Sequence, residues 1–351
     1  MRRAAGMPEV SVLIKAYNEA AHIDAAIASV WAARHEIEPL TLEIVVADSL
    51  SLDDTVQRAG RWAKLAPVRV VQLVEPLDRG CGTGVELGYV WSQGTWVLLM
   101  DADMTLQPGF LGVAMAHLAR NPQLAGVAGK IGDAALRNGT DRIRQANALG
   151  RTPGRRPWLE GGGLYRRRAI EEAGGHAGDM RLAAFEEADL GLRLHRAGWA
   201  LERLPIESMR HDGHRMETRA LLLQRWRSGR AQAAGRLLRL HLGRPYGWRT
   251  LKLLAHPLML GAGWVGGGVL WVSAPPQARA SIAAWGLAAV LAGSAAQAVR
   301  KRSVQHVLTA WLDWHLMLAG IVQGLLAAMP PRPRVPPSRL LQTEAELGPA
   351  A

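Results

Sequence analysis

Two aspartates, Asp101 and Asp103, stand two positions apart directly after the apolar run at residues 97–100. Such a run is typical of a strand that is buried on both faces of a sheet. Carboxylates are rarely buried unless they are paired or bind a metal, and hard divalent cations prefer oxygen ligands. The pair therefore predicts a cation site at the end of a core strand; a solvated turn is the alternative interpretation.

The chain around this pair alternates strand-like and helix-like segments, which predicts a doubly wound, mostly parallel α/β sheet. The expected strands are residues 10–14, 42–46, 68–74 and 96–100, and the expected helices are residues 20–33, 55–65 and 80–91. In open α/β sheets, ligands bind at the carboxyl ends of the strands. Asp48 follows the second strand, so we expect it at the same sheet edge as Asp101 and Asp103.

The composition of the 351-residue chain changes after Glu217. Residues 1–217 carry 26 Lys and Arg against 27 Asp and Glu, whereas the rest carries 16 against 3 among long apolar runs. A segment that is both basic and apolar favours anionic lipid head groups as partners. Nucleic-acid binding would call for basic residues interleaved with stacking aromatics on a soluble module, so we expect none.

Two further function classes are disfavoured by short patterns. The single cysteine, Cys81, leaves no internal disulfide and no cysteine-based zinc site. The glycine-rich run at residues 80–84 has neither the spacing nor the position of a dinucleotide-binding fingerprint, which argues against a dehydrogenase.

Five short motifs follow one another along residues 8–230: Lys15-Ala16-Tyr17-Asn18-Glu19, residues 48–55, Asp101-Ala102-Asp103, residues 160–165 and Glu186-Glu187-Ala188-Asp189-Leu190. In this order they resemble the motifs of glycosyltransferase family 2, the nucleotide-sugar enzymes with the A-type fold. Three departures stand out, because Lys15 replaces the usual Pro, Leu50 the usual Gly, and Glu187 the common catalytic Asp. We expect a subgroup with its own donor or acceptor preference.

The resemblance and the motif positions together imply roles for individual residues. Nucleotide-sugar binding is expected from Ala16, Tyr17, Glu19, Asp48, Arg79 and Asp101; acceptor binding from Gly162, Gly163, Asp189, Arg225 and Trp226. A divalent cation, Mg²⁺ or Mn²⁺, would be held by Asp103 and Asp101, with His211 or His214 as a further ligand. Glu187 is the expected catalytic base, and Glu186 is the second candidate.

Four regions follow from these patterns. They are a nucleotide-sugar-binding catalytic domain (8–217), basic amphipathic interfacial helices (218–252), transmembrane or membrane-associated helices (253–328) and a Pro-rich tail (329–351). The runs 253–274 and 281–299 are long enough to cross a bilayer, and their basic flanks predict a catalytic domain on the cytoplasmic face. The run 304–328 contains Asp313, so both crossing and interfacial packing stay open.

The expected function is an inverting, metal-dependent transfer of a sugar from a nucleotide-diphosphate sugar to a lipid-linked or envelope glycan acceptor at the cytoplasmic (inner) membrane. Leu222 stands where processive family members have the Gln of a Gln-x-x-Arg-Trp motif, so we expect a non-processive enzyme. Two alternatives remain. A catalytically silent membrane scaffold would release no nucleoside diphosphate, and a nucleotidyltransferase would release pyrophosphate.

Overall fold

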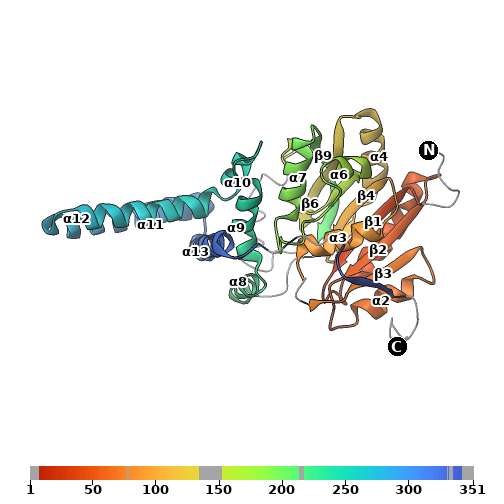
Figure 1. Ribbon diagram of the computed structural model, residues 1–351, viewed down its shortest axis with the longest axis horizontal. Helices are drawn as coiled ribbons and strands as arrows, with labels where there is room; N and C mark the ends of the chain where they lie inside the picture. The colour runs from red at the N-terminus through yellow and green to blue at the C-terminus, as the bar shows by residue number, and fades with distance from the viewer. Residues whose placement is uncertain are drawn as a thin grey trace. The chain divides into compact units, whose positions relative to one another are not determined.

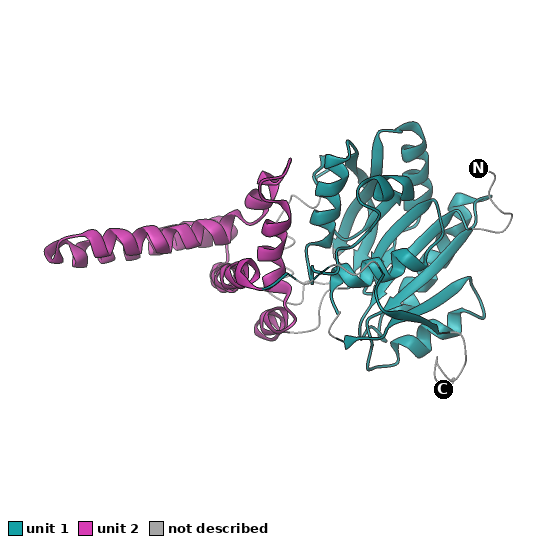
Figure 2. Cartoon of the chain, viewed as in Figure 1, with its two compact units in different colours: residues 1–135, 148–213, 328–351 teal, residues 136–147, 214–327 magenta. Residues whose placement is uncertain are grey.

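The structure is a computed structural model that describes residues 8–76, 79–133, 152–212, 217–329, 331 and 335–341. The chain falls into two compact units, coloured separately in Figure 2. Unit 1 comprises residues 1–135, 148–213 and 328–351, and unit 2 comprises residues 136–147 and 214–327.

Unit 1 is built on a mixed sheet, whose described strands number ten (Figure 1). They are β1 (Val10–Ala16), β2 (Leu42–Asp48), β3 (Val68–Leu73), β4 (Trp96–Asp101), β5 (Met104–Leu106), β6 (Leu124–Asp133), β7 (Gly154–Arg156), β8 (Gly163–Arg166), β9 (Ala200–His211) and β10 (Ser338–Leu341). Their order is β10-β3-β2-β1-β4-β8-β6-β9-β5, and β7 pairs with β9. Strands β3, β2, β1 and β4 run parallel, which confirms the predicted α/β class.

Helices cover both faces of this sheet (Figure 1). One core contains side chains of α1 (Ile23–Ala33), α2 (Thr55–Trp62) and α4 (Phe110–Arg120). The other contains side chains of α3 (Cys81–Trp91), α6 (Arg167–Glu172) and α7 (Glu186–Arg196). Successive strand residues point to opposite faces, so Ile14 enters the first core and Leu13 the second. A short 3₁₀ helix, η1 (Arg34–Ile37), follows α1.

One strand of unit 1 comes from the far end of the chain. β10 pairs antiparallel with β3, with Ser338 opposite Leu73 and Leu341 opposite Val70. This strand lies in residues 329–351, the region expected to be a Pro-rich tail without a strand. A four-residue strand at a sheet edge has too little periodicity to be recognised locally.

Unit 2 is helical. Its described helices are α8 (Thr218–Arg227), α9 (Arg230–His241), α10 (Trp248–Leu253), α11 (Ala255–Ser273), α12 (Pro276–Lys301) and α13 (Val304–Leu326). α9 and α13 pack closely through small residues: a Cβ on Gly324 would lie 2.1 Å from the Gln232 carbonyl oxygen. Among the described helices, α12 is the one long and apolar enough to cross a membrane; it has no buried residue and contains the predicted span 281–299. α11, which contains most of 253–274, is not apolar enough by the same measure.

Candidate active site

Three neighbouring strands end together at one edge of the sheet. The parallel register places Ala16 opposite Asp48 and Lys15 opposite Asp101. The ends of β2 and β4 therefore bring their carboxylates to the same edge, on either side of β1. Asp103 follows two residues later, and its backbone carbonyl accepts a hydrogen bond from the Asp212 amide at 3.1 Å.

A small cavity lies at this edge, and charged side chains from three separate elements line it. Lys15 comes from β1, Asp101 from β4, and Glu186 and Glu187 from the first turn of α7. The remaining lining is apolar or glycine: Leu13, Gly84, Val85, Leu99, Met100, Gly162, Ala177 and Leu190. Polar groups converging in an apolar cavity are typical of a binding or catalytic site.

The Lys15 ammonium bridges two of these carboxylates. Its Nζ lies 2.5 Å from Glu186 Oε1 and 3.0 Å from Asp101 Oδ1. Burial alone would lower the pKa of Lys15, but the neighbouring carboxylates, Asp101 foremost, raise it well above its usual value. Lys15 is therefore a fixed positive charge at the position where the family resemblance leads one to expect proline.

Glu187 has a different environment from its neighbour Glu186. Burial, and then the negative charges of Glu186 and Asp101, raise the pKa of Glu187 to about 8, although Lys15 acts in the opposite direction. The residue before this pair, Phe185, adopts a left-handed conformation with φ 67°. Side-chain-bearing residues rarely adopt such backbone, and such strain is concentrated at functional sites.

Gly162 brings backbone to the wall of the cavity. Its φ is +98°, and a Cβ there would lie 2.1 Å from the Leu99 carbonyl oxygen. Only glycine fits this combination of conformation and space.

Two histidines, His211 and His22, contact carboxylates in the segments that adjoin Asp101 and the end of β1. The pairing of β5 with β9 sets Met104 opposite His211, and His211 Nε2 lies 3.0 Å from Asp103 Oδ2. His22 contacts Glu19 through Nδ1 at 2.7 Å and Asp212 through Nε2 at 3.0 Å. Burial and then the charge of Asp103 raise the pKa of Glu19 to about 7. A cation bound among these carboxylates would offset their excess of negative charge.

The end of β2 carries a further buried carboxylate, Asp48. Asp48 is fully buried, and its Oδ2 accepts hydrogen bonds from the Ser51 amide at 3.1 Å and from Gln72 Nε2 at 2.9 Å. Among the described residues, no hydrogen-bond partner is found for the other oxygen, Oδ1. A buried acceptor without a partner is costly, so this oxygen is suited to receive a donor from a ligand.

Arg79 and Tyr17 pack together next to the loop that follows β2. The guanidinium carbon lies 4.8 Å from the centroid of the Tyr17 ring, and Arg79 donates to the carbonyls of Ser49 and Leu50 at 2.9 Å each. Leu50, which replaces the family's usual glycine, keeps the left-handed conformation with φ 62°. The loop therefore retains a glycine-like shape at a non-glycine residue.

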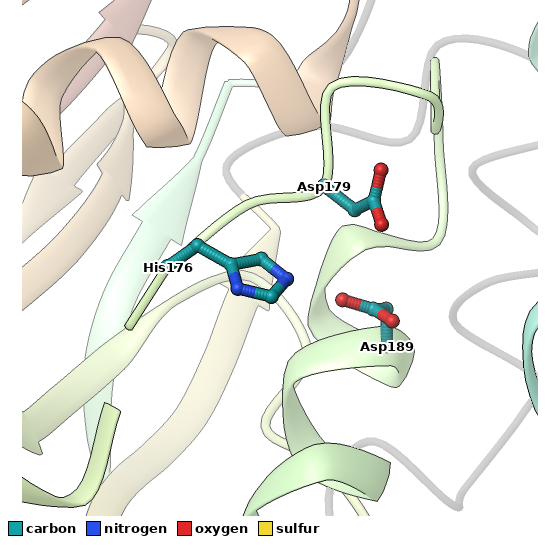
Figure 3. Close-up of side chains that lie close together, drawn as sticks. All are labelled: His176, Asp179 and Asp189. Carbon is teal, nitrogen blue, oxygen red and sulfur yellow. The ribbon is translucent and has the colours of Figure 1, made fainter. Parts of the chain in front are cut away.

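A second group of titratable residues is formed by Asp189 of α7 and by His176 and Asp179, which precede that helix in the chain (Figure 3). One ligand atom from each of His176, Asp179 and Asp189 lies within 4.8 Å of the others, so these buried residues could hold a metal ion. Arg181 contacts Asp179 at 2.5 Å, and Arg193 contacts Asp189 at 2.8 Å. Two guanidinium groups thus balance the two carboxylates without a cation.

The structure locates most of the predicted residues. Asp189 faces this buried cluster and does not line the cavity. Arg225 and Trp226 belong to unit 2, where Arg225 lies 3.8 Å from Asp313. His214 lies outside the described residues.

Four residues that contact predicted site residues or their partners have no role predicted from the sequence. These residues are His22, Gln72, Asp212 and Arg339. Asp212 had a local signal, because it follows His211 directly. The others lie in segments without a motif.

Part of unit 1 matches a known family of enzymes. Residues 11–174 match the family model described as glycosyl transferase family 2. The succinoglycan biosynthesis protein ExoO of Rhizobium meliloti is 32% identical over 102 residues, which span 29% of this chain and 27% of that protein.

Solved structures share the fold. The mannosyltransferase PcManGT from Pyrobaculum calidifontis, in complex with GDP-Man and Mn²⁺, aligns over 92% of this chain and 88% of its own, with TM-score 0.60 and 21% identity. Residues 1–349 of S. aureus TarS, in complex with UDP-GlcNAc, align over 90% and 91%, with TM-score 0.51 and 14% identity. At such identities these two structures support the fold alone.

Proposed function

Because residues 11–174 match the model of glycosyltransferase family 2, we propose that this chain transfers a sugar from a nucleoside diphosphate sugar to an acceptor hydroxyl, with inversion at the anomeric carbon. The observation that carries the proposal is the cavity at the sheet edge. Lys15, Asp101, Glu186 and Glu187 reach it from three elements. A set of charges this concentrated is unusual in a cavity that serves only packing.

The nucleotide binds at the end of β2. Tyr17 and Arg79 offer a flat, cationic surface for the base and ribose, and their 4.8 Å stacking keeps that surface in one orientation. Asp48 Oδ1 is the acceptor for an N–H group of the base. Glu19 and Asp101 are the other residues that the family resemblance assigns to the donor.

Asp103 and His211 hold the divalent cation, with Asp101 nearby. A carboxylate oxygen and an imidazole nitrogen 3.0 Å apart form a donor set that suits Mn²⁺, so the residues fit the ion. When bound, the cation neutralises the diphosphate and makes it a better leaving group. The cluster of His176, Asp179 and Asp189 is a less suitable site, because Arg181 and Arg193 already balance its carboxylates.

Glu187 accepts the proton of the attacking hydroxyl. A base works best when its pKa is close to the working pH, and the pKa of Glu187 is raised to about 8. Glu186 is a poorer candidate because Lys15 holds its carboxylate at 2.5 Å. Gly162 and Gly163 let backbone approach the sugar or the acceptor closely.

The acceptor is a lipid-linked or envelope glycan at the cytoplasmic face of the inner membrane, extended by one sugar per event. Two observations support this part of the proposal. One relative is named for succinoglycan biosynthesis, and α12 exposes apolar side chains such as Trp285 and Leu291 along its length. Exposed apolar surface of this extent favours lipid as a partner. Arg225 and Trp226 remain candidate acceptor contacts.

Thermal stabilisation by nucleotide sugars tests the donor site. We expect UDP-sugars or GDP-sugars to raise the unfolding midpoint of the full-length protein only when Mn²⁺ or Mg²⁺ is present, and EDTA to abolish the effect. In Asp103→Asn, the shift of the unfolding midpoint by nucleotide sugars should no longer depend on added metal. In Asp48→Asn, the shift should be smaller with every nucleotide sugar. If no nucleotide sugar stabilises the protein, the proposal is wrong.

A further inference from the structure

The edge strand β10 carries a side chain that reaches towards the nucleotide pocket. In the register of the sheet, Arg339 of β10 lies opposite Gln72 of β3, and Gln72 lies opposite Asp48 of β2. The three residues form one row across three neighbouring strands. Directly opposite residues share a face of the sheet, so their side chains are able to interact.

Two hydrogen bonds run along this row. Arg339 Nη2 donates to Gln72 Oε1 at 2.9 Å, and Gln72 Nε2 donates to Asp48 Oδ2 at 2.9 Å. A guanidinium only donates and a carboxylate only accepts, so the orientation of the Gln72 amide is determined by its two neighbours. Arg339 holds the amide oxygen on its own side, which directs the amide nitrogen at Asp48.

As a consequence, the two carboxylate oxygens of Asp48 differ in their hydrogen bonding. Oδ2 receives Gln72 and the Ser51 amide, which leaves Oδ1 as the oxygen without a partner among the described residues. If the Gln72 amide turned over, its oxygen would face the carboxylate and repel it. The carboxylate would then rotate or move, and Oδ1 would lose its orientation.

The strand is held by contacts that do not involve the Arg339 side chain. Trp91 Nε1 donates to Ser338 Oγ at 3.0 Å, and the Val74 amide donates to the Pro337 carbonyl at 2.9 Å. Leu341 is buried in the core of the sheet, whereas Arg339 is exposed. Removal of the guanidinium therefore leaves the pairing of β10 intact.

We infer that Arg339 is a positioning residue for recognition of the nucleotide base, acting through Gln72 on Asp48. The inference rests on the proposed nucleotide-sugar site. The group recognised at this site is the N–H edge of the base in a nucleoside diphosphate. Because β10 follows α13 in the chain, this base site is complete only after the apolar helices have been synthesised.

Binding of UDP, GDP and inorganic pyrophosphate to the full-length protein in Mn²⁺, measured by calorimetry, tests the inference. We expect Arg339→Met to lower the affinity for the preferred nucleoside diphosphate about 3- to 10-fold, as loss of one hydrogen bond would. The ratio between the UDP and GDP affinities should also fall. Pyrophosphate has no base, so its affinity should not change. The unfolding midpoint without ligand should also stay unchanged.

Matched variants separate the possible results. Arg61→Met removes an exposed arginine from the last turn of α2 and should leave all three affinities unchanged. Gln72→Met should lower the affinity for the same nucleotide. The double variant with Arg339→Met should bind that nucleotide no more weakly than Gln72→Met alone.

Two outcomes would overturn the inference, and they are distinguishable. If Arg339→Met behaves like Arg61→Met while Asp48→Asn weakens nucleotide binding, the row from β10 does not position Asp48, although the nucleotide site stands. If neither UDP nor GDP binds to the unmodified protein, the proposed function itself fails.

Discussion

Glu187 illustrates how one side chain affects both catalysis and stability. Its pKa rises from a usual value near 4.5 to about 8 in the folded protein. Between these values the unfolded chain has lost the proton and the folded chain still holds it. Unfolding is therefore increasingly favoured as the pH rises through this window, and the effect is constant above about pH 8. The residue suited to be the base thus lowers stability at neutral pH.

This linkage predicts the behaviour of Glu187→Gln. The amide cannot ionise, so the variant should gain stability relative to the unmodified protein as the pH rises from 5 to 8.5. We expect the difference in unfolding midpoint to grow by at least a few degrees over this range, measured by scanning calorimetry. Glu171→Gln, at an exposed position on α6, is the control and should show no such growth. A difference that is equal at both pH values would contradict the linkage.

Gly162 lies in the turn before β8. The stability of a variant at this position tests why the turn has a glycine there. Gly162→Ala would combine a left-handed φ of +98° with a Cβ 2.1 Å from the Leu99 carbonyl oxygen. Gly154→Ala has a similar φ of +106° but open space around its Cβ. Conformational strain alone costs about 1–2 kcal/mol.

We therefore expect Gly154→Ala to lose about 1–2 kcal/mol of unfolding free energy, and Gly162→Ala to lose clearly more. Denaturant titration of both variants measures the difference. Equal losses would mean that the close approach to Leu99 does not matter, and that the turn needs glycine only for its backbone conformation.

The elements that the sequence predicts well are those whose signals are local. Asp101 follows an apolar strand and Glu187 begins an amphipathic helix, so each could be recognised within about ten residues. The shared edge of Asp48 and Asp101 followed from the rule that parallel strands present their ends at one edge, whereas no such rule placed Glu187 there. Arg339 could not be predicted, because it lies 267 residues from Gln72 and nothing near it indicates the pairing. Lys15 was noticed as a departure, but its bridge between Asp101 and Glu186 required coordinates.

At the scale of the whole molecule, β10 constrains the path of the chain through a membrane. β10 is hydrogen-bonded to β3, so both strands are on the same side of any bilayer. The helices between residues 214 and 327 must therefore cross an even number of times. α12 is long and apolar enough to cross. α11 is less apolar, but a short turn joins it to α12, and an even number of crossings requires a second helix beside α12. We predict that α11 and α12 cross as a hairpin, while α13 packs on the arginine-bearing helix α9 at the interface.

Single cysteines in a Cys81→Ser background test this topology in cells. A membrane-impermeant maleimide should label Gln277→Cys, at the start of α12 next to the turn from α11, from outside the cytoplasmic membrane. Ser303→Cys and Ala328→Cys should be labelled only in inverted vesicles. Labelling of Ala328→Cys from outside would show an odd number of crossings and contradict the pairing of β10. Labelling of Gln277→Cys only from the cytoplasmic side would exclude the hairpin.

The most direct test of the central claim, that carboxylates from separate elements join to transfer a sugar, is release of nucleoside diphosphate by the purified full-length protein. We expect release from UDP-sugars or GDP-sugars with Mn²⁺ and a membrane lipid extract as acceptor source. Glu187→Gln should lower the rate about 100- to 10,000-fold while donor binding persists. No release from any donor, or an undiminished rate in Glu187→Gln, would contradict the account.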